Sequence, residues 1–253
     1  MIKYCFINQK GGVGKTTSCL NVGAALAKKG YKVLLVDTDA QGSLTQSAGV
    51  QISDEAPTVL EVLKGAADIN AAIVERGRYC ILPADIRLSG ADLELNNVIG
   101  RERLLQEALA KLNRPFDYIL IDCPPTLSLI TVMSLAAADK VIIPIQAHYL
   151  ALNGCAQLLD TIKLVKARIN TGLEIGGVIV TMYDSRKNLA NEVADNIRAA
   201  FPAKVFNNFI PDNVSLAEAP AFGRDIFEYK PDSKGAQQYK ALTDEIITRT
   251  KES

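Results

Sequence analysis

The chain has 253 residues, of which 48% are hydrophobic and 22% charged, as in soluble globular proteins with a sizeable core. Lysine plus arginine and aspartate plus glutamate both number 28, so the net charge is zero and excludes a strong overall attraction to nucleic acid or lipid. The cysteines are scattered, which argues against disulfides and a zinc site. The N-terminus is too polar for a signal peptide, and no apolar run is long enough for a membrane span. We therefore expect a cytoplasmic protein.

Short apolar runs alternate with longer helical patterns. Strands are expected at Tyr4–Ile7, Val33–Val36, Tyr79–Leu82, Tyr118–Ile121, Val141–Ile145, Gly177–Thr181 and Lys204–Phe206. Helices are expected at Thr16–Lys29, Arg101–Leu112, Leu127–Ala138, Leu152–Ile169, Leu189–Phe201 and Lys234–Thr248. This rhythm predicts an α/β fold, a doubly wound, mainly parallel sheet with helices on both faces, in a single domain over residues 1–253. Residues 51–78 are the least regular part and have room for short helices over a sheet edge.

The segment NQKGGVGKTT, residues 8–17, follows the first strand and opens the first helix. It lacks the first glycine of G-x-x-x-x-G-K-[ST], since Gln9 stands there, but its context is that of a P-loop. Backbone N–H groups in such a loop converge on phosphate, and its glycines permit the close approach. Lys15 is expected to contact the β- and γ-phosphates and Thr16 to bind Mg²⁺. The predicted phosphate-binding residues are Lys10, Gly11, Gly12, Val13, Gly14, Lys15, Thr16 and Thr17.

Acidic residues directly follow two predicted strands. VLLVDTDAQG ends a strand with Asp37 and Asp39, and YILIDCPPT ends another with Asp122. A carboxylate after four apolar residues is costly to bury unless it faces a cation, and parallel strands bring such residues to the phosphate loop. We therefore expect Asp122 to hold Mg²⁺ through water, with Thr16 and Asp37 as further metal candidates, and Asp39 to orient the attacking water. The alternative that the aspartates only cap the following segments stays open.

KGGVGKTT, together with DTDAQG and DCPP, resembles the deviant Walker A P-loop family, which includes ParA and Soj partition ATPases, MinD and the nitrogenase iron protein. In that family the extra lysine reaches the nucleotide of the neighbouring subunit. The resemblance implies that Lys10 does so in an ATP-sandwich dimer, acting as an arginine finger does. The catalytic residues that it implies are Lys10, Lys15 and Asp39.

Three later segments resemble ParA/Soj proteins of the short class, which have no N-terminal DNA-reading domain. They are KVIIPIQAHYLALNG (140–154), GVIVTMYDSR (177–186) and FIPDNVSLAEAPAFGRDI (209–226). The resemblance implies that Met182, Pro211 and Asn213 lie beside the adenine. It further implies a slow ATPase, with ATP and Mg²⁺ as cofactors, that binds double-stranded DNA non-specifically as a homodimer, associates with the nucleoid, and positions a plasmid, a chromosome or other cargo. A ParB-like or analogous adaptor would stimulate hydrolysis.

Non-specific DNA binding requires basic side chains that contact phosphates. Arg186 and Lys187 match the basic position of the family, and Arg198 and Arg224 are further candidates. However, Asp212 and Ser215 stand where related proteins often carry arginines. The sequence therefore leaves it open whether DNA binding is retained.

Three other functions stay open. A MinD-like ATPase that acts on membranes would need a stronger amphipathic C-terminal helix, so we expect no membrane partner. An iron-protein-like reductase would need cysteines at a dimer axis, and Cys80 and Cys123 lack the flanking sequence of such reductases. A biosynthetic ligase resembling dethiobiotin synthetase would need a metabolite pocket. His148, the only histidine, has no partner in sequence that would indicate a metal site.

Overall fold

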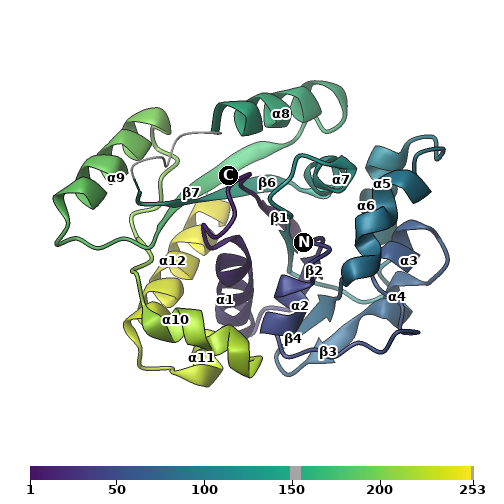
Figure 1. Cartoon of the computed structure of the whole chain (residues 1–253), viewed down its shortest axis with the longest axis horizontal. Coiled ribbons are helices and arrows are strands. Elements are labelled where there is room, and N and C mark those ends of the chain that lie inside the picture. The colour runs from purple at the N-terminus through teal and green to yellow at the C-terminus, as the bar shows by residue number, and fades with distance from the viewer. Residues whose placement is uncertain (149–154, 252–253) are drawn as a thin grey trace.

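The computed structural model describes residues 1–148 and 155–251. At its centre is a seven-stranded sheet in the order β3-β4-β2-β5-β1-β6-β7 (Figure 1). Only the β3–β4 pair is antiparallel within this sheet. The predicted doubly wound, mainly parallel sheet is therefore confirmed, whereas the single-domain interpretation stays a prediction. The strands are β1 (Ile2–Phe6), β2 (Val33–Asp37), β3 (Val74–Arg76), β4 (Tyr79–Leu82), β5 (Tyr118–Asp122), β6 (Lys140–Gln146) and β7 (Glu174–Thr181).

Helices cover both faces of the sheet, and Figure 1 shows α1 beside α12 on one face and α7 with α8 across from them. The first face carries α1 (Lys15–Lys28), α2 (Ser43–Ser47), α10 (Val214–Glu218), α11 (Ile226–Tyr229) and α12 (Lys234–Lys251). The other face carries α3 (Val59–Leu63), α4 (Ile69–Ala72), α5 (Ala91–Glu94), α6 (Leu104–Ala110), α7 (Leu129–Ala137), α8 (Cys155–Arg168) and α9 (Asn188–Ala200). Short 3₁₀ turns are η1 (Ile86–Gly90), η2 (Arg101–Arg103) and η3 (Ala219–Phe222).

The alternation of side chains along β1 explains the two core layers. Tyr4 and Phe6 belong to the core beneath α1 and α12, whereas Cys5 and Ile7 belong to the core beneath α7. Successive side chains of a strand point to opposite faces, so an unbroken apolar run supplies both layers at once. For the same reason every residue of β2 and β5 is buried, including the aspartate that ends each strand.

The strand order reverses at β1, which pairs with β5 on one side and β6 on the other. Segments that leave the two sides of such a point diverge to opposite faces, and a crevice opens at the carboxyl ends of the strands. Residues 8–14 occupy that crevice, because they directly follow β1 and lead into α1. The fold thus places the predicted phosphate loop at the position where sheets of this type bind ligands.

Two strand assignments from the sequence differ from the structure. The edge strand β3 is short and mostly exposed, so it has no apolar pattern that would reveal it. The strand expected at Lys204–Phe206 is wrong, because these residues make only an isolated bridge, Val178 with Val205. After that bridge the backbone N–H groups of Asn207 and Asn208 donate to the Glu245 carboxylate, which interrupts the pairing with β7 until Ile210 donates to the carbonyl oxygen of Val180 (2.9 Å).

Short helices are present in the irregular part of the chain, where α3 and α4 lie within residues 51–78. The helix expected from Leu152 is described from Cys155 onward, and residues 149–154 lie outside the described residues. No helix in the described ranges is both long and apolar enough to cross a bilayer.

The end of α2 packs directly on the end of η3 through two glycines. A Cβ on Gly49 would lie 2.5 Å from the carbonyl oxygen of Gly223. The Arg76 guanidinium holds the same junction, since it donates to the carbonyl oxygens of Ala48 (2.6 Å) and Gly223 (3.1 Å). The contact therefore joins backbone to backbone, with no flexible side chain that could move aside.

We predict that Gly49→Ala destabilises the protein far more than Gly65→Ala. Both glycines have a positive φ, 72° and 70°, but a Cβ on Gly65 would meet no described atom within 4 Å. Gly65→Ala should lower the free energy of unfolding by about 1 kcal/mol through backbone strain alone. Gly49→Ala should cost about 2 kcal/mol more, because the methyl group overlaps the backbone of Gly223. Chemical denaturation measures both values, and equal losses would contradict the close contact.

Candidate active site

The loop after β1 is braced by two polar side chains. The Asn8 side chain donates to the carbonyl oxygen of Pro144 in β6 (2.7 Å), and its Oδ1 accepts from the backbone N–H of Lys10 (3.0 Å). The Thr181 hydroxyl, at the end of β7, donates to the carbonyl oxygen of Val13 (2.8 Å). The sequence analysis missed both bracing residues. A polar residue directly after an apolar strand, as in GVIVT, was the signal that could have identified Thr181.

The backbone of this loop fits an anion. Gly12 and Gly14 have φ values of 71° and 85°, in the left-handed region that glycine adopts without strain. Gly14 is the N-cap of α1, and no side chain among the described residues caps the first turn of that helix. The N–H groups of the first turn therefore lack intrahelical partners, and the helix dipole adds positive potential there. These are the features that phosphate oxygens require.

Two lysines contribute to the loop in different ways. Lys15 is only 7% exposed, and its ammonium donates to the carbonyl oxygen of Lys10 (3.2 Å). Burial lowers the pKa of Lys15, while nearby Asp122 opposes that change. The half-buried Lys10 is anchored through its backbone, and its ammonium makes no ion pair or hydrogen bond with any described residue. The Lys15 ammonium is thus fixed by the backbone of the loop, whereas the Lys10 ammonium has no partner among the described residues and can bind an anion.

Asp122 lies directly behind the loop. It is fully buried, and its Oδ2 accepts a hydrogen bond from the Thr16 hydroxyl (2.6 Å). Its Oδ1 is buried without a hydrogen-bond partner in the part of the chain that the structure describes. Burial and the nearby Asp37 raise the pKa of Asp122 well above its ordinary value. A buried carboxylate oxygen without a donor lies where a cation or its water ligand would stabilise it.

The hydroxyl of Thr16 and the carboxylate of Asp122 fit Mg²⁺, which prefers oxygen ligands. Across residues 1–148 and 155–251, no group of three His, Cys, Asp or Glu side chains is placed to hold a metal by itself. That arrangement suits an ion that takes its other ligands from phosphate oxygens and water, as Mg²⁺ does in nucleotide sites. The residues present therefore fit this cofactor.

Asp37 and Asp39 lie at the end of β2 with different surroundings. Asp37 is fully buried, and it accepts from the backbone N–H and hydroxyl of Thr45 (2.8 and 2.7 Å) and from the backbone N–H of Asp39 (3.1 Å). Burial raises the pKa of Asp37 to about 6. These contacts tie β2 to α2, and the metal role of Asp37 stays a prediction. Asp39 is half-buried and lines a hollow of about 320 Å³ with Pro124 and Pro125. The water-orienting role of Asp39 also stays a prediction.

The structure brings the predicted adenine residues to the phosphate loop. Met182, Pro211 and Asn213 line one pocket of about 110 Å³ with Gly14 and Thr17. Asn213 also caps α10, since its Oδ1 accepts from the backbone N–H of Leu216 (3.3 Å). The pocket walls also contain Ile210, Leu216 and Tyr239, which are not among the residues predicted from the sequence. These buried residues come from three separate segments, so no local sequence pattern links them.

The predicted DNA-binding residues are only partly brought together. Arg186 and Arg198 line a groove of about 700 Å³, and Lys234 and Asp212 also lie along it. Lys187 follows Arg186 in the chain but does not line the groove. Arg224 is exposed in the turn before α11 and is not part of the groove either. Ser215, the other departure from the basic pattern, is buried at the start of α10.

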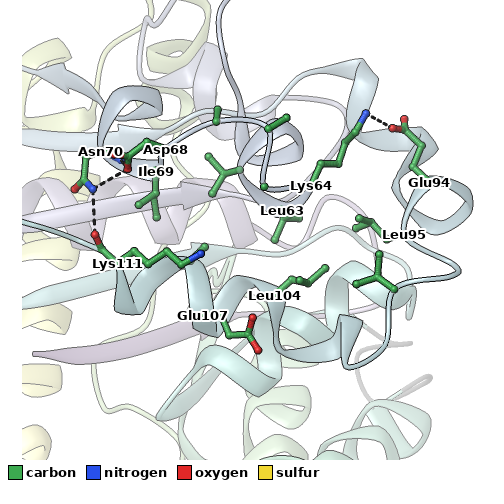
Figure 2. Close-up of a pocket in the computed structure, with 16 residues that line it drawn as sticks. Leu63, Lys64, Asp68, Ile69, Asn70, Glu94, Leu95, Leu104, Glu107 and Lys111 are labelled. Atoms are coloured by element: carbon green, nitrogen blue, oxygen red, sulfur yellow. Dashed lines mark hydrogen bonds and ion pairs between the residues drawn. The ribbon is translucent and has the colours of Figure 1, made fainter.

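A separate hollow of about 660 Å³ lies between the α3–α4 segment and the helices α5 and α6. Figure 2 shows the Lys64 ammonium paired with Glu94 at one end and Asn70 bonded to Asp68 and the Lys111 carbonyl at the other. None of the predicted site residues lines this hollow. It is therefore distinct from the phosphate-loop site.

We predict that Asp122→Asn stabilises the nucleotide-free protein at pH 8. In the folded state the pKa of Asp122 is raised above its unfolded value, so wild-type protein loses stability as the pH rises between the two pKa values. Asparagine removes that loss and can still accept from Thr16. We expect a gain of about 1–3 kcal/mol at pH 8, smaller at pH 5, by chemical denaturation. Asp160→Asn on exposed α8 serves as the control. A loss of stability at pH 8 would contradict the predicted cost of the buried charge.

Comparisons with known proteins identify the family. A family model described as "AAA domain" matches residues 1–175. The chain is 46% identical to the sporulation initiation inhibitor protein Soj of Bacillus subtilis, covering 94% of this chain and 95% of that protein. It is 43% identical to the chromosome partitioning protein ParA of Caulobacter vibrioides, covering 97% and 93%.

A solved structure supports the same fold. The chain is 37% identical to cobyrinic acid a,c-diamide synthase from Mycobacterium smegmatis with bound ADP and magnesium, with a TM-score of 0.88 and coverage of 99% of this chain and 96% of that chain. The curated relatives match more closely in sequence and over almost the whole length of both chains. This protein therefore belongs to the Soj/ParA family of chromosome-partitioning ATPases.

Proposed function

We propose that this chain is a Mg²⁺-dependent ATPase that forms an ATP-sandwich homodimer, binds double-stranded DNA non-specifically, and positions a chromosome, a plasmid or other cargo. The observation that carries the proposal is the braced phosphate loop, with the Thr16–Asp122 contact behind it. At the edge of this loop lies the Lys10 ammonium, which has no ion-pair or hydrogen-bond partner among the described residues. The resemblance to Soj and ParA supports a ParB-like or analogous adaptor as the partner that stimulates slow hydrolysis. The proposed location is the nucleoid within the cytoplasm, with no membrane partner.

Each part of the nucleotide has a matching set of residues. The N–H groups of residues 12–17 and the Lys15 ammonium would hold the phosphates, and Met182, Pro211 and Asn213 would surround the base. Thr16 and Asp122 would hold Mg²⁺, which when bound draws charge from phosphate oxygens. The ADP and magnesium in the mycobacterial relative support this assignment.

The hydrolytic step would depend on Asp39 and Lys10. Asp39 is half-buried at the carboxyl end of β2, beside the strand that ends in Asp122, so its carboxylate can accept a proton or a hydrogen bond from the attacking water. Lys10 would place its ammonium on the phosphates of the neighbouring subunit's nucleotide. Because this cation arrives only with the second subunit, hydrolysis would be conditional on dimer formation.

One solved structure favours a second candidate function. The likeness to a protein named cobyrinic acid a,c-diamide synthase favours a biosynthetic amide-forming ATPase as the alternative. Measuring which small molecules raise ATP turnover separates the two, since a ligase would respond to a carboxylic acid substrate and a partition ATPase to DNA and its adaptor. The reductase alternative has weaker support, because Cys123 is buried with its sulfur 3.1 Å from that of Cys5.

The first test is sedimentation of the purified protein with non-specific duplex DNA, in ATP and in ADP, at two salt concentrations. We expect binding with ATP only, falling steeply with salt, because phosphate contacts release counterions. An absence of binding in either nucleotide would contradict the DNA-binding part of the proposal. Pelleting with liposomes would then test the MinD-like alternative.

We predict that Lys10→Ala still binds ATP but loses stimulated hydrolysis. The variant lacks one cation that would stabilise the negative charge developing on the phosphates in the transition state. Its turnover should therefore be slower on the order of 10²- to 10³-fold. The matched control is Lys163→Ala, an exposed lysine on α8. Nucleotide binding and stimulated turnover are measured for both variants. Normal stimulated turnover in Lys10→Ala would show that the cross-dimer role is wrong.

We predict that Asp39→Ala accumulates as an ATP-bound dimer. The Asp39 charge acts on the Lys15 ammonium of the phosphate loop, and its loss should slow hydrolysis while leaving the loop and the Thr16–Asp122 contact intact. Analytical ultracentrifugation in ATP and in ADP measures the dimer fraction. A variant that stays monomeric in ATP would contradict the assigned role.

A further inference from the structure

The groove that contains Arg186 carries nearly balanced charge. Its lining includes three cations, Arg186, Arg198 and Lys234, and two carboxylates, Asp184 and Asp212. A groove that attracts a polyanion through phosphate contacts alone would carry an excess of cations. The two carboxylates therefore oppose any DNA that enters, and their positions decide by how much.

Asp184 holds the Arg186 guanidinium in a two-pronged contact. Nε of Arg186 donates to Oδ1 and its NH2 group donates to Oδ2, both at 2.9 Å. The backbone N–H of Arg186 also donates to Oδ1 at 3.1 Å. The arginine side chain is 87% exposed and that of Asp184 is 17% exposed, so the anion is fixed at the wall and the cation lies over it. The Arg186 hydrogen bonds hold the pKa of Asp184 well below its usual range.

The wall that carries Asp184 is rigid and adjoins the base pocket. The backbone N–H of Tyr183 donates to the carbonyl oxygen of Ile210 (3.0 Å), and Tyr183 forms a bridge with Pro211. The rings of Tyr183 and Phe209 pack edge to face, 4.9 Å apart. Pro211 and Asp212 line both the groove and the base pocket. Asp184 is therefore held in place by the same segments that border the nucleotide.

Arg198 is held differently. Its guanidinium lies over the Phe209 ring, 4.8 Å from the centroid, and pairs with Asp195 one helical turn away. Asp195 is 73% exposed and does not line the groove. The Phe209 ring is therefore the contact within the groove that orients the Arg198 guanidinium. Arg186 is thus the groove arginine whose fork is occupied by a carboxylate that itself lines the groove.

We propose that Asp184 limits the affinity of this groove for DNA by competing with backbone phosphates for the Arg186 guanidinium. This rests on the proposed DNA-binding function. A phosphate and a carboxylate accept the same planar fork of donors, so one excludes the other. An exposed ion pair of this kind contributes little to stability, so DNA displaces the carboxylate at a modest cost. Asp184 sets the affinity without blocking the groove.

The test is Asp184→Asn in the full chain with ATP, measured by titration of non-specific duplex DNA. Asparagine keeps an oxygen for the Arg186 backbone N–H but has no charge to hold the guanidinium. We expect binding roughly two- to fivefold tighter than wild type, the range that an exposed ion pair allows. Asp160→Asn, which removes an exposed carboxylate paired with Lys163 on α8, should change binding little. Thermal unfolding confirms that the variants fold.

A double-mutant comparison separates competition from simple repulsion. Lys187 also lies near Asp184, with its ammonium 4.0 Å from Oδ2, so the comparison removes both cations. In an Arg186→Ala, Lys187→Ala background Asp184→Asn should give little or no gain, because neither cation remains to be released. An equal gain in both backgrounds would overturn the proposal, as would an unchanged affinity of Asp184→Asn where wild type binds DNA. If neither wild type nor Asp184→Asn binds DNA in ATP, the proposed DNA-binding function itself fails, and the inference with it.

Discussion

The structure depends on one electrostatic constraint, which is the burial of charge at the carboxyl edge of a parallel sheet. Asp37 and Asp122 end neighbouring strands and are both fully buried, and Lys15 is nearly so. Desolvation of these groups opposes their charged forms, as their shifted pKa values indicate. A folded protein retains such a cluster only when other interactions hold it in place. In this chain the interactions come from the strand ends themselves.

Backbone and hydroxyl contacts hold the cluster together from three sides. Thr38 donates through its N–H and hydroxyl to the carbonyl oxygen of Asp122, at 3.0 and 2.6 Å, which locks the ends of β2 and β5. Asn8 and Thr181 fix the loop to β6 and β7 in the same way. From the helix side, the Ser18 and Tyr239 hydroxyls lie 3.0 Å apart and join α1 to α12. The phosphate loop is consequently braced by several strands and by α1, which favours N–H groups that are oriented before any ligand arrives.

The sequence predicts the central strands and the phosphate loop well, because buried parallel strands and glycine turns leave strong local patterns. It fails where structure depends on distant partners. Residues 204–206 are apolar enough for a strand, yet Glu245 on α12 takes the next two backbone donors. The proposed base pocket could be predicted only through resemblance. Met182 and Pro211 lie in segments far apart in the chain, which the bridge between Tyr183 and Pro211 brings together. The pairing of Arg186 was readable in principle, because DSR places the carboxylate two residues away, but its geometry was not.

The phosphate loop and the groove differ in how their charges are balanced. At the phosphate loop the charged groups Asp37, Asp122 and Lys15 are buried, so only a ligand of matching shape and charge can balance them. Along the groove the cations are exposed and paired within the chain, as Arg186 with Asp184 and Arg198 with Asp195. Exposed pairs exchange partners at little cost, which would suit the reversible DNA binding that we propose. The net charge of the chain is zero, so it creates no overall field that would attract DNA. Under the proposed function, DNA binding would therefore depend on the groove and on the number of subunits that present it.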